Sequence, residues 1–567
     1  MSKPKLALIP SGYKSGKVYS ILPNDATGDF DFERQSIGTR VRKDGLIEEA
    51  KTVGSITNIL QRSEEFNNSY WSKQGGCTIT SNTTLAPDGT NTADTLSGAT
   101  GTSVSGTVLR RNVVISGTST LSIYVKSLGS TNFTIYIRNG GNGQVFSQSI
   151  TPNNDWQRVT LTTDPANGQV FFGNTNGDVA IWGAMLSEGA LSDYIKTEGS
   201  SETKTVETFT DVPRLDWLNS NCPTLLLEPQ RTNYIKYSQD ITQSIWNKRN
   251  VNYSSNFIDP SGKTNAFKIY PDTVNTEHYL EQTLSITTAT TYTASVFLKD
   301  GGTSNFEIII VHVGVGIAVS RALFTITNGV ISFSSSTGII QNVELKDFGN
   351  GWYRCEVKYN WTGTVTSHRL RILPRENGTY VGDNINGVYV YGMQVEQATY
   401  PTSYIKTEAS TVTRLKDECI NGGDSDLFDI TEGTFFVDAN NFGTPLNDYN
   451  MITLSDGGNN FVRFLYESSR IRTSVYNGAT QQDYFITGVN DNERNKVAIT
   501  FKENEFKTYF NGVLKHTDTS GVVPINFDRL NFASQSGTSR HFEGKVYDTR
   551  VYDRVLTEAE AIEITTL

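Results

Sequence analysis

Short runs of β-branched and aromatic residues alternate with polar positions along most of this 567-residue chain. Clusters of Gly, Asn, Asp and Ser separate the runs, and helix-forming stretches are sparse. Alternation with a period of two, broken by turn residues, is typical of half-buried strands in sandwiches or barrels. A chain of this length exceeds a single core and suggests roughly three or four domains. The pattern therefore predicts an all-β, multidomain protein.

The pentapeptide YIKTE occurs at 194–198 and again at 404–408, and each copy closes a longer stretch of self-similarity. The segments 57–71 and 232–246 match, as do LSIYVKSLGSTNFTIYI with YTASVFLKDGGTSNFEIII and DWQRVTL with GWYRCEV. Landmarks that recur in one order indicate a tandem duplication. The second copy is longer by about 35 residues, mostly in its middle.

The two copies, residues 58–200 and 233–408, carry strand-length segments at nearly even spacing, which suggests jelly-roll β-sandwiches. Tryptophans recur at matched positions of the two copies: Trp71 with Trp246, and Trp156 with Trp352. Recurrence beside strands favours core packing for these rings, although a tryptophan face also suits a sugar ring. The layout resembles the galactose-binding-like and carbohydrate-binding-module jelly rolls, which implies display, spacing or multivalent contact.

Residues 427–567 have a different pattern. They contain the hairpin KVAITFKENEFKTYFNGVLKHTDTS and end in FEGKVYDTRVYDRVLTEAEAIEITTL. Thr557 and Glu560 have the spacing of a capping box, which predicts a short terminal helix. The ending resembles the signature of the laminin-G/concanavalin-A-like lectin fold. That resemblance implies a third β-sandwich.

Aromatic and amide side chains in Asn/Gly/Gln-rich segments of this domain are the candidates for a glycan site. They are Tyr449, Tyr476, Gln481, Gln482 and Tyr484. The run YNGATQQDYF, residues 476–485, offers rings and amides together, which suits sugar hydroxyls, although a solvated hairpin loop has the same composition.

Laminin-G-like domains sometimes hold calcium at the sandwich rim. The oxygen-rich turns SDGGNN and NDNE make Asp456 and Asp491 candidate ligands. Such turns are also ordinary hairpin chemistry. We expect no other cofactor.

The N-terminal residues 1–57 include GDFDFERQSIGTRV, a unit too small to bury its own apolar face, so we expect it to dock on something larger. With DVPRLDWLNSNCPTLLLEPQRTN, this segment resembles a type of tailed-phage structural protein, often a tail fibre or virion protein. The resemblance implies docking on other virion proteins through residues 1–57. Residues 201–232 and 409–426 are then expected as linkers, with the first sandwich inserted between the two halves of that layout.

The charge and the cysteine spacing limit which binding partners and which cellular compartment we expect for this chain. The formal charge is 49 − 59 = −10 and the basic residues are dispersed, so we expect no nucleic-acid partner. The four cysteines lie far apart without a CxxC pair, which favours reduced, buried thiols over zinc or disulfides; they are Cys77, Cys222, Cys355 and Cys419. We find no membrane-spanning run and no signal-peptide core, so we expect assembly in the host cytoplasm and no membrane insertion.

The sequence contains no GxSxG, HExxH or phosphate-loop motif, and its five histidines are scattered, so we expect no enzyme. The carboxylates Glu188 and Glu396, which follow corresponding strands of the two copies, are better explained by a duplicated structural role than by catalysis.

Together these interpretations predict a bacteriophage virion protein that displays β-sandwiches for host-surface glycan recognition on the particle exterior. A fibre of this kind is expected to be a homo-oligomer, with a trimer favoured. The alternatives are a purely architectural decoration protein and, less favoured, a glycan depolymerase.

Overall fold

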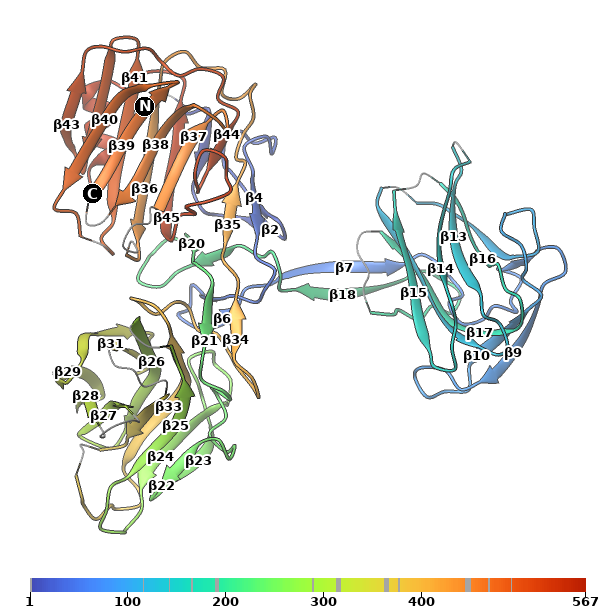
Figure 1. The fold of residues 1–567 in the computed structure, drawn as a ribbon, viewed down its shortest axis with the longest axis horizontal. Helices are drawn as coiled ribbons and strands as arrows, with labels where there is room; N and C mark the ends of the chain where they lie inside the picture. The colour runs from blue at the N-terminus through green and yellow to red at the C-terminus, as the bar shows by residue number, and fades with distance from the viewer. Residues whose placement is uncertain are drawn as a thin grey trace. The chain divides into compact units, whose positions relative to one another are not determined.

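The computed structural model is all-β apart from one short helix in the residues that it describes (Figure 1). Those residues are 3–115, 117–141, 143–164, 167–188, 193–287, 290–312, 318–361, 367–375, 378–443, 450–467, 470–490 and 492–567. The chain divides into two compact units. One is Val53–Thr208, and the other combines Met1–Thr52 with Phe209–Leu567. No described helix is long and apolar enough to cross a bilayer.

The unit Val53–Thr208 is a β-sandwich of two antiparallel sheets. The first sheet has the order β15 (Gln157–Thr163), β12 (Ser119–Ser127), β17 (Val179–Glu188), β10 (Ala93–Ser97), β9 (Thr78–Thr84). The second has the order β14 (Val145–Ile150), β13 (Phe133–Asn139), β16 (Gly168–Gly173), β11 (Leu109–Val113), β8 (Ser72–Lys73). Strands β7 (Thr52–Asn58) and β18 (Glu202–Thr208) pair separately, at the two ends of the unit's sequence.

The second copy of the repeat forms a larger sandwich within the other unit. One sheet has the order β22 (Asn247–Arg249), β25 (Tyr279–Ser285), β32 (Ser367–Leu373), β27 (Asn305–His312), β28 (Ala318–Thr327), β29 (Val330–Thr337). The other has the order β23 (Val251–Phe257), β24 (Ala266–Pro271), β33 (Gly387–Glu396), β26 (Thr290–Gly301), β31 (Tyr353–Trp361), β30 (Ile340–Asp347). Strands β21 (Arg231–Asn233) and β34 (Val412–Arg414) pair at its ends.

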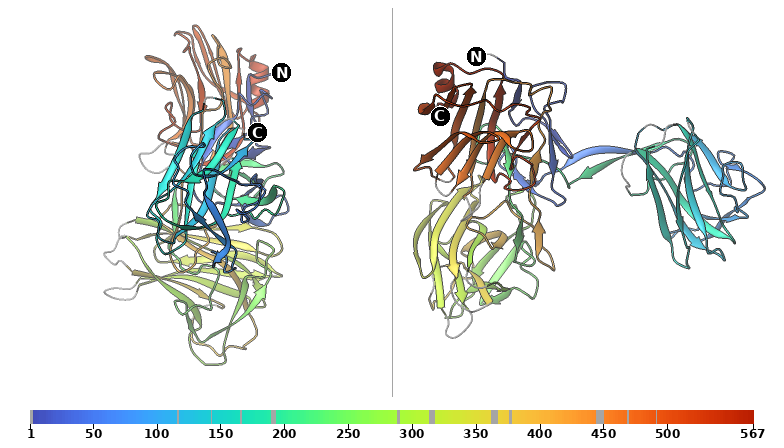
Figure 2. Two further views of the ribbon diagram at one scale, coloured as in Figure 1. Left: turned by 90° about the vertical axis from the view of Figure 1, so that its right-hand side faces the viewer. Right: turned by 45° about the horizontal axis from the view of Figure 1, so that its top comes forward.

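The C-terminal residues form a third sandwich in the same unit. Its outer sheet has the order β19 (Arg214–Asp216), β20 (Thr224–Leu227), β45 (Gly544–Tyr552), β36 (Gly433–Asn441), β41 (Asn495–Lys502), β42 (Glu505–Phe510), β43 (Val513–Asp518). The facing sheet has the order β40 (Thr480–Thr487), β39 (Arg470–Asn477), β38 (Asn460–Glu467), β37 (Asn450–Ser455), β44 (Arg529–Asn531). Helix α1 (Glu558–Thr565) packs on the outer sheet (Figure 2). Thr557 and Glu560 form the predicted capping box.

The N-terminal segment is part of this third sandwich. Strand β1 (Leu6–Leu8) pairs with the C-terminal half of β45, and β20 pairs with the N-terminal half of the same edge. Strands β2 (Tyr13–Lys14), β3 (Lys17–Val18), β4 (Phe30–Glu33) and β35 (Glu418–Ile420) form a further small sheet, and β5 (Thr39–Val41) pairs with β6 (Ile47–Glu49). Leu6, Phe30 and Leu225 lie in the sandwich's own core. The apolar face expected to dock on something larger is therefore buried against the chain's own third sandwich, and residues 201–232 and 409–426, expected as linkers, carry strands.

The repeated sequence landmarks close each copy of the sandwich in the same way. The side-chain amide of Asn58 donates to two backbone carbonyls near the end of its copy, at 3.1 and 2.8 Å, and that of Asn233 does so at 3.2 and 2.9 Å. The hydroxyl of the YIKTE tyrosine, Tyr194 or Tyr404, lies 2.6 Å from a serine Oγ near the start of its copy. The pentapeptide recurs because in each copy it joins the last segment of the sandwich to the first segment of the same sandwich.

The match of Glu188 with Glu396 between the two copies is wrong by one residue. In the first copy Thr120 pairs with Ser187, whereas its counterpart Thr293 pairs with Glu396. Glu188 is exposed, and Glu396 is fully buried and accepts a hydrogen bond from a backbone N–H at 2.9 Å. The two carboxylates therefore do not occupy equivalent positions.

The prediction that all four thiols are buried is wrong for one of them, because Cys222 is exposed while the other three cysteines are buried.

A buried ion cluster joins segments that are distant in sequence. Arg34 and Arg214 donate to Asp417, and Arg214 and Arg414 pair with Glu228. All five side chains are at most 4% exposed. Burial acts to raise the pKa of Glu228, but the charges of Arg414 and Arg214 outweigh it and hold that pKa well below its usual range. The cluster is a ready explanation for why residues 1–52 and 209–567 form one compact unit.

Candidate functional site

The predicted glycan-binding run 476–485 forms the end of β39, a short turn and most of β40. Because strand side chains alternate between faces, its members separate. Gln482 faces the core, is 1% exposed and donates to Thr508 Oγ1 at 2.7 Å. Tyr484 packs against the same core and stacks on His516, with 4.6 Å between ring centroids. These two residues support the sandwich from within.

Gln481 and Tyr476 lie nearer the surface. Gln481 accepts a hydrogen bond from the Val522 N–H at 2.8 Å and donates to Ala479 O at 3.0 Å, so its amide holds the hairpin turn. Tyr476 is half-buried and stacks flat on Phe461, with 5.0 Å between centroids and 3° between planes. Of the described members of the proposed set, Tyr476 has the placement that a ligand-contacting ring requires.

Two predicted residues, Tyr449 and Asp491, lie outside the described residues. Asp456, the other calcium candidate, accepts hydrogen bonds from Gly458 N at 2.7 Å, Asn460 N at 3.1 Å and Asn460 Nδ2 at 2.7 Å. These bonds hold its own turn. The part of the chain that the structure describes contains no group of three or more His, Cys, Asp and Glu side chains that could hold a metal. Calcium binding stays a prediction.

A surface of aromatic and charged side chains follows the outward positions of β38, β39 and β40. We call it the aromatic–arginine face; it consists of Arg463, Tyr476, Asp483 and Phe485 together with Phe461, which points to this side but is only 6% exposed. The Arg463 guanidinium lies 4.7 Å from the Phe461 centroid, and the rim residue Arg470 lies 4.3 Å from that of Phe485. Phe485 is 36% exposed. Rings and fork-shaped donors side by side can stack on a pyranose and hydrogen-bond its hydroxyls.

Burial and ion pairing shift the pKa values of the charged side chains in this face. Burial lowers the pKa of Arg463 to about 10, so the guanidinium remains protonated at neutral pH. Its buried Nε has no hydrogen-bond partner among the described residues. Asp483 pairs with Arg472 through two 2.6 Å contacts, and although burial opposes it, these bonds lower the pKa of Asp483. The face therefore presents an ionised acceptor beside a cation whose buried Nε is unsatisfied.

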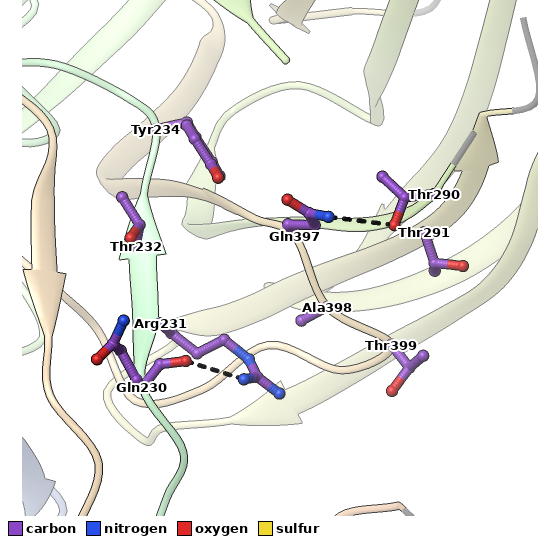
Figure 3. A pocket seen from close by; sticks show the side chains of 9 residues that line it. All are labelled: Gln230, Arg231, Thr232, Tyr234, Thr290, Thr291, Gln397, Ala398 and Thr399. Carbon is purple, nitrogen blue, oxygen red and sulfur yellow. Dashed lines mark hydrogen bonds between the residues drawn. The ribbon is translucent and has the colours of Figure 1, made fainter. Parts of the chain in front are cut away.

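A pocket lies at the edge of the second sandwich, where β21 approaches the start of β26 and the segment after β33 (Figure 3). Its volume is about 360 Å³. The lining is almost wholly hydroxyl and amide, with one arginine and one tyrosine: Gln230, Arg231, Thr232, Tyr234, Thr290, Thr291, Gln397, Ala398 and Thr399. Arg231 donates to the Gln230 carbonyl at 2.9 Å and lies over the ring of Tyr400, 5.5 Å from its centroid.

Comparison with known proteins agrees with the geometry of the third sandwich. Residues 435–561 match the family model described as the concanavalin A-like lectin/glucanases superfamily. The C-terminal sandwich is lectin-like. This match indicates a carbohydrate-binding domain, and it starts within β36 and ends within α1. A search of curated proteins finds no match.

Solved structures similar to this chain include several carbohydrate-binding modules. The CBM40 of Ruminococcus gnavus IT-sialidase bound to α2,3-sialyllactose is 16% identical, with 24% of this chain and 83% of that chain covered and a TM-score of 0.21. The CBM22-1–CBM22-2 tandem of Paenibacillus barcinonensis Xyn10C is 13% identical, covering 62% and 99%, with a TM-score of 0.22. Mouse laminin α1 domains LG4-5 are 11% identical, covering 51% and 90%, with a TM-score of 0.20.

Of the aromatic–arginine face, sequence reasoning had named only Tyr476. Phe461, Arg463 and Phe485 belong to strands that alternate regularly, and only their position opposite inward-facing neighbours identifies them as a surface. The alternation FVRFLYE in β38 was the available signal. Core packing of the repeated tryptophans is correct for Trp71, Trp246 and Trp352, each at most 2% exposed, and Trp156 is half-buried.

Proposed function

We propose that this chain is a bacteriophage virion protein, a tail fibre or particle-surface fibre, that recognises host-surface glycans through its lectin-like sandwich. The observation that carries the proposal is the lectin-family match at residues 435–561, on a folded sandwich that carries the aromatic–arginine face. Support for the virion role comes from residues 1–57 and 211–233, which resemble tailed-phage structural proteins. The N-terminal strands pair and pack within the chain's own third sandwich. Attachment to the particle therefore uses surfaces other than the buried face of these strands.

Glycan recognition by this face rests on stacking and on charge-assisted hydrogen bonds. Tyr476 and Phe485 supply rings, while Asp483 and Arg463 supply an acceptor and donors. Single sites of this kind bind weakly, and a homo-oligomer, with a trimer favoured, multiplies the avidity.

The glycan test uses the full-length chain on an array of bacterial surface oligosaccharides. Tyr476→Ala and Phe485→Ala are each expected to weaken binding at least about tenfold, which is about 1.4 kcal/mol. Phe333→Ala is the matched control, because Phe333 is an exposed ring on β29 away from this face. Wild-type protein that binds no oligosaccharide, or variants that bind as well as the wild type, would contradict this assignment.

The virion test is separate. Antibodies against the chain should label purified phage particles, and the free protein should compete with phage adsorption to host cells. Particles that lack the chain would refute the virion role, whatever the array shows.

A further inference from the structure

A cleft of about 600 Å³ lies between the second sandwich and the lectin-like sandwich, both of which belong to one compact unit. Asn342, Glu344 and Lys358 on β30 and β31 line one wall. Phe442 and Tyr547 line the other. This volume lies within the range of about 300–1,000 Å³ that is typical of ligand sites, and such sites favour the space between domains.

The two walls are joined by hydrogen bonds, so the cleft is already formed without a ligand. Tyr400 comes from the second sandwich, donates to Glu543 Oε2 at 2.9 Å and packs on Phe442, 5.7 Å between centroids. A second link comes from the Ser403 N–H of the second sandwich, which donates to Glu228 Oε1 at 2.8 Å directly after β20 of the lectin-like sandwich. A preformed site loses less free energy to ordering when a ligand binds.

The first sandwich shows which contacts of this wall are structural, because β12 and β15 of the first copy correspond to β26 and β31 of the second. Arg158 donates to Ser122 Oγ at 2.9 Å in the first copy, and Arg354 donates to Ser295 Oγ at 2.9 Å in the second. That contact is kept in both copies.

The positions beside this retained pair have changed. With Trp156 aligned to Trp352, Thr160 and Thr162 of the first copy become Glu356 and Lys358. Strand β30, which supplies Asn342 and Glu344, belongs to the part in which the second copy is longer. The cleft wall therefore includes charged and amide residues that the shared fold does not require, beside the retained Arg354.

The wall charges nearly balance, because five cationic and four anionic side chains line the cleft. Glu356 pairs with Lys346 at 2.9 Å and Lys545 pairs with Asp216. Glu344 and Lys358 lie with opposite charges on neighbouring strands. A site with this balance does not select a polyanion. The exposed groups are amides, one carboxylate, one ammonium and aromatic rings, which together suit the hydroxyls and C–H faces of uncharged sugars.

We infer that this cleft is a second carbohydrate site that binds a neutral oligosaccharide of a few sugar units. The inference rests on the proposed glycan-binding function and adds a site and a ligand class to it. The pocket of Figure 3 shares Thr399 with the cleft, so a longer chain could continue from one into the other.

The test measures full-length protein on an array of neutral and anionic tetra- to hexasaccharides. One variant combines Asn342→Ala with Glu344→Ala on one wall, and the other is Tyr547→Ala on the opposite wall. Both Asn342 and Glu344 are exposed, so the double variant should fold normally. The matched control is Ser334→Ala, an exposed residue on the neighbouring β29 that does not line the cleft.

We expect both cleft variants to lose at least tenfold in affinity for neutral oligosaccharides, while Ser334→Ala keeps that binding. Unchanged binding in both cleft variants, with loss in Tyr476→Ala, would overturn the cleft site and leave the lectin-face proposal intact. Binding to anionic oligosaccharides alone would overturn the neutral ligand class. A wild type that binds no oligosaccharide would overturn both proposals.

Discussion

Removal of one charge from the buried ion cluster should destabilise the larger unit strongly. Asp417 has a fully buried carboxylate that pairs with Arg34 at 2.7 Å and with Arg214, and accepts a hydrogen bond from the Glu228 N–H at 2.8 Å. In Asp417→Asn, three buried guanidinium groups would face one carboxylate. Loss of one partner of a buried ion pair costs about 3–5 kcal/mol, a large fraction of a domain's stability of about 5–15 kcal/mol.

The measurement is equilibrium urea unfolding of the full-length chain. With a urea dependence of about 1–3 kcal/mol per molar, the unfolding midpoint of the larger unit should fall by at least about 1 M. The transition of Val53–Thr208 should not move. Asp553→Asn is the control, because its pair with Lys5 spans 3.6 Å at the surface and is worth about 0–1 kcal/mol. A loss below about 1 kcal/mol in Asp417→Asn would refute the view that this cluster joins the unit.

The structure supports three further predictions. Burial lowers the pKa of both His312 and His368, the latter to about 4, and His312 Nδ1 lies 3.4 Å from His368 Nε2 in the second sandwich. Since both pKa values lie below the unfolded value of about 6.5, stability should fall on the order of 2 kcal/mol as pH drops from about 6.5 to 4. Thermal melts of His368→Leu should show a weaker pH dependence. Tyr194→Phe and Tyr404→Phe should each lose about 0.5–1.5 kcal/mol in urea unfolding through the tyrosine–serine hydrogen bond, and Tyr194→Phe should lose more, because its hydroxyl also donates to Glu64 Oε1 at 2.9 Å; equal losses would contradict this. Reducing-end assays on host polysaccharide should detect no release by the full-length chain, and time-dependent release would favour a depolymerase.

Local patterns were sufficient for the fold class, the duplication and the terminal helix. Alternation identifies strands, and the Thr557–Glu560 spacing identifies the helix start, because both are set by neighbours in sequence. The matched Asn58 and Asn233 could be found for the same reason, since a repeated structural role keeps a repeated residue.

Pairings across hundreds of residues could not be predicted. Leu225 lies in a segment expected as a linker, yet it pairs with Val546, and Leu6 pairs with Val551. The partner of an edge strand depends on which surface remains open after the sheet forms, and local sequence does not contain that information. One member of the candidate site lies inward for a related reason: a glutamine suggests a surface, but Gln482 occupies an inward position of β40 and its amide donates to Thr508.

The N-terminal strands also determine which protein should be tested, because a fragment of residues 427–567 would lack β1, β19 and β20 of the outer sheet. The most direct test of the account is therefore the binding of full-length protein to intact host cells before and after periodate oxidation of their surface sugars. We predict saturable binding that oxidation abolishes and that Tyr476→Ala weakens. Binding that survives oxidation, or no binding by a folded oligomer, would contradict glycan recognition and favour a purely architectural role.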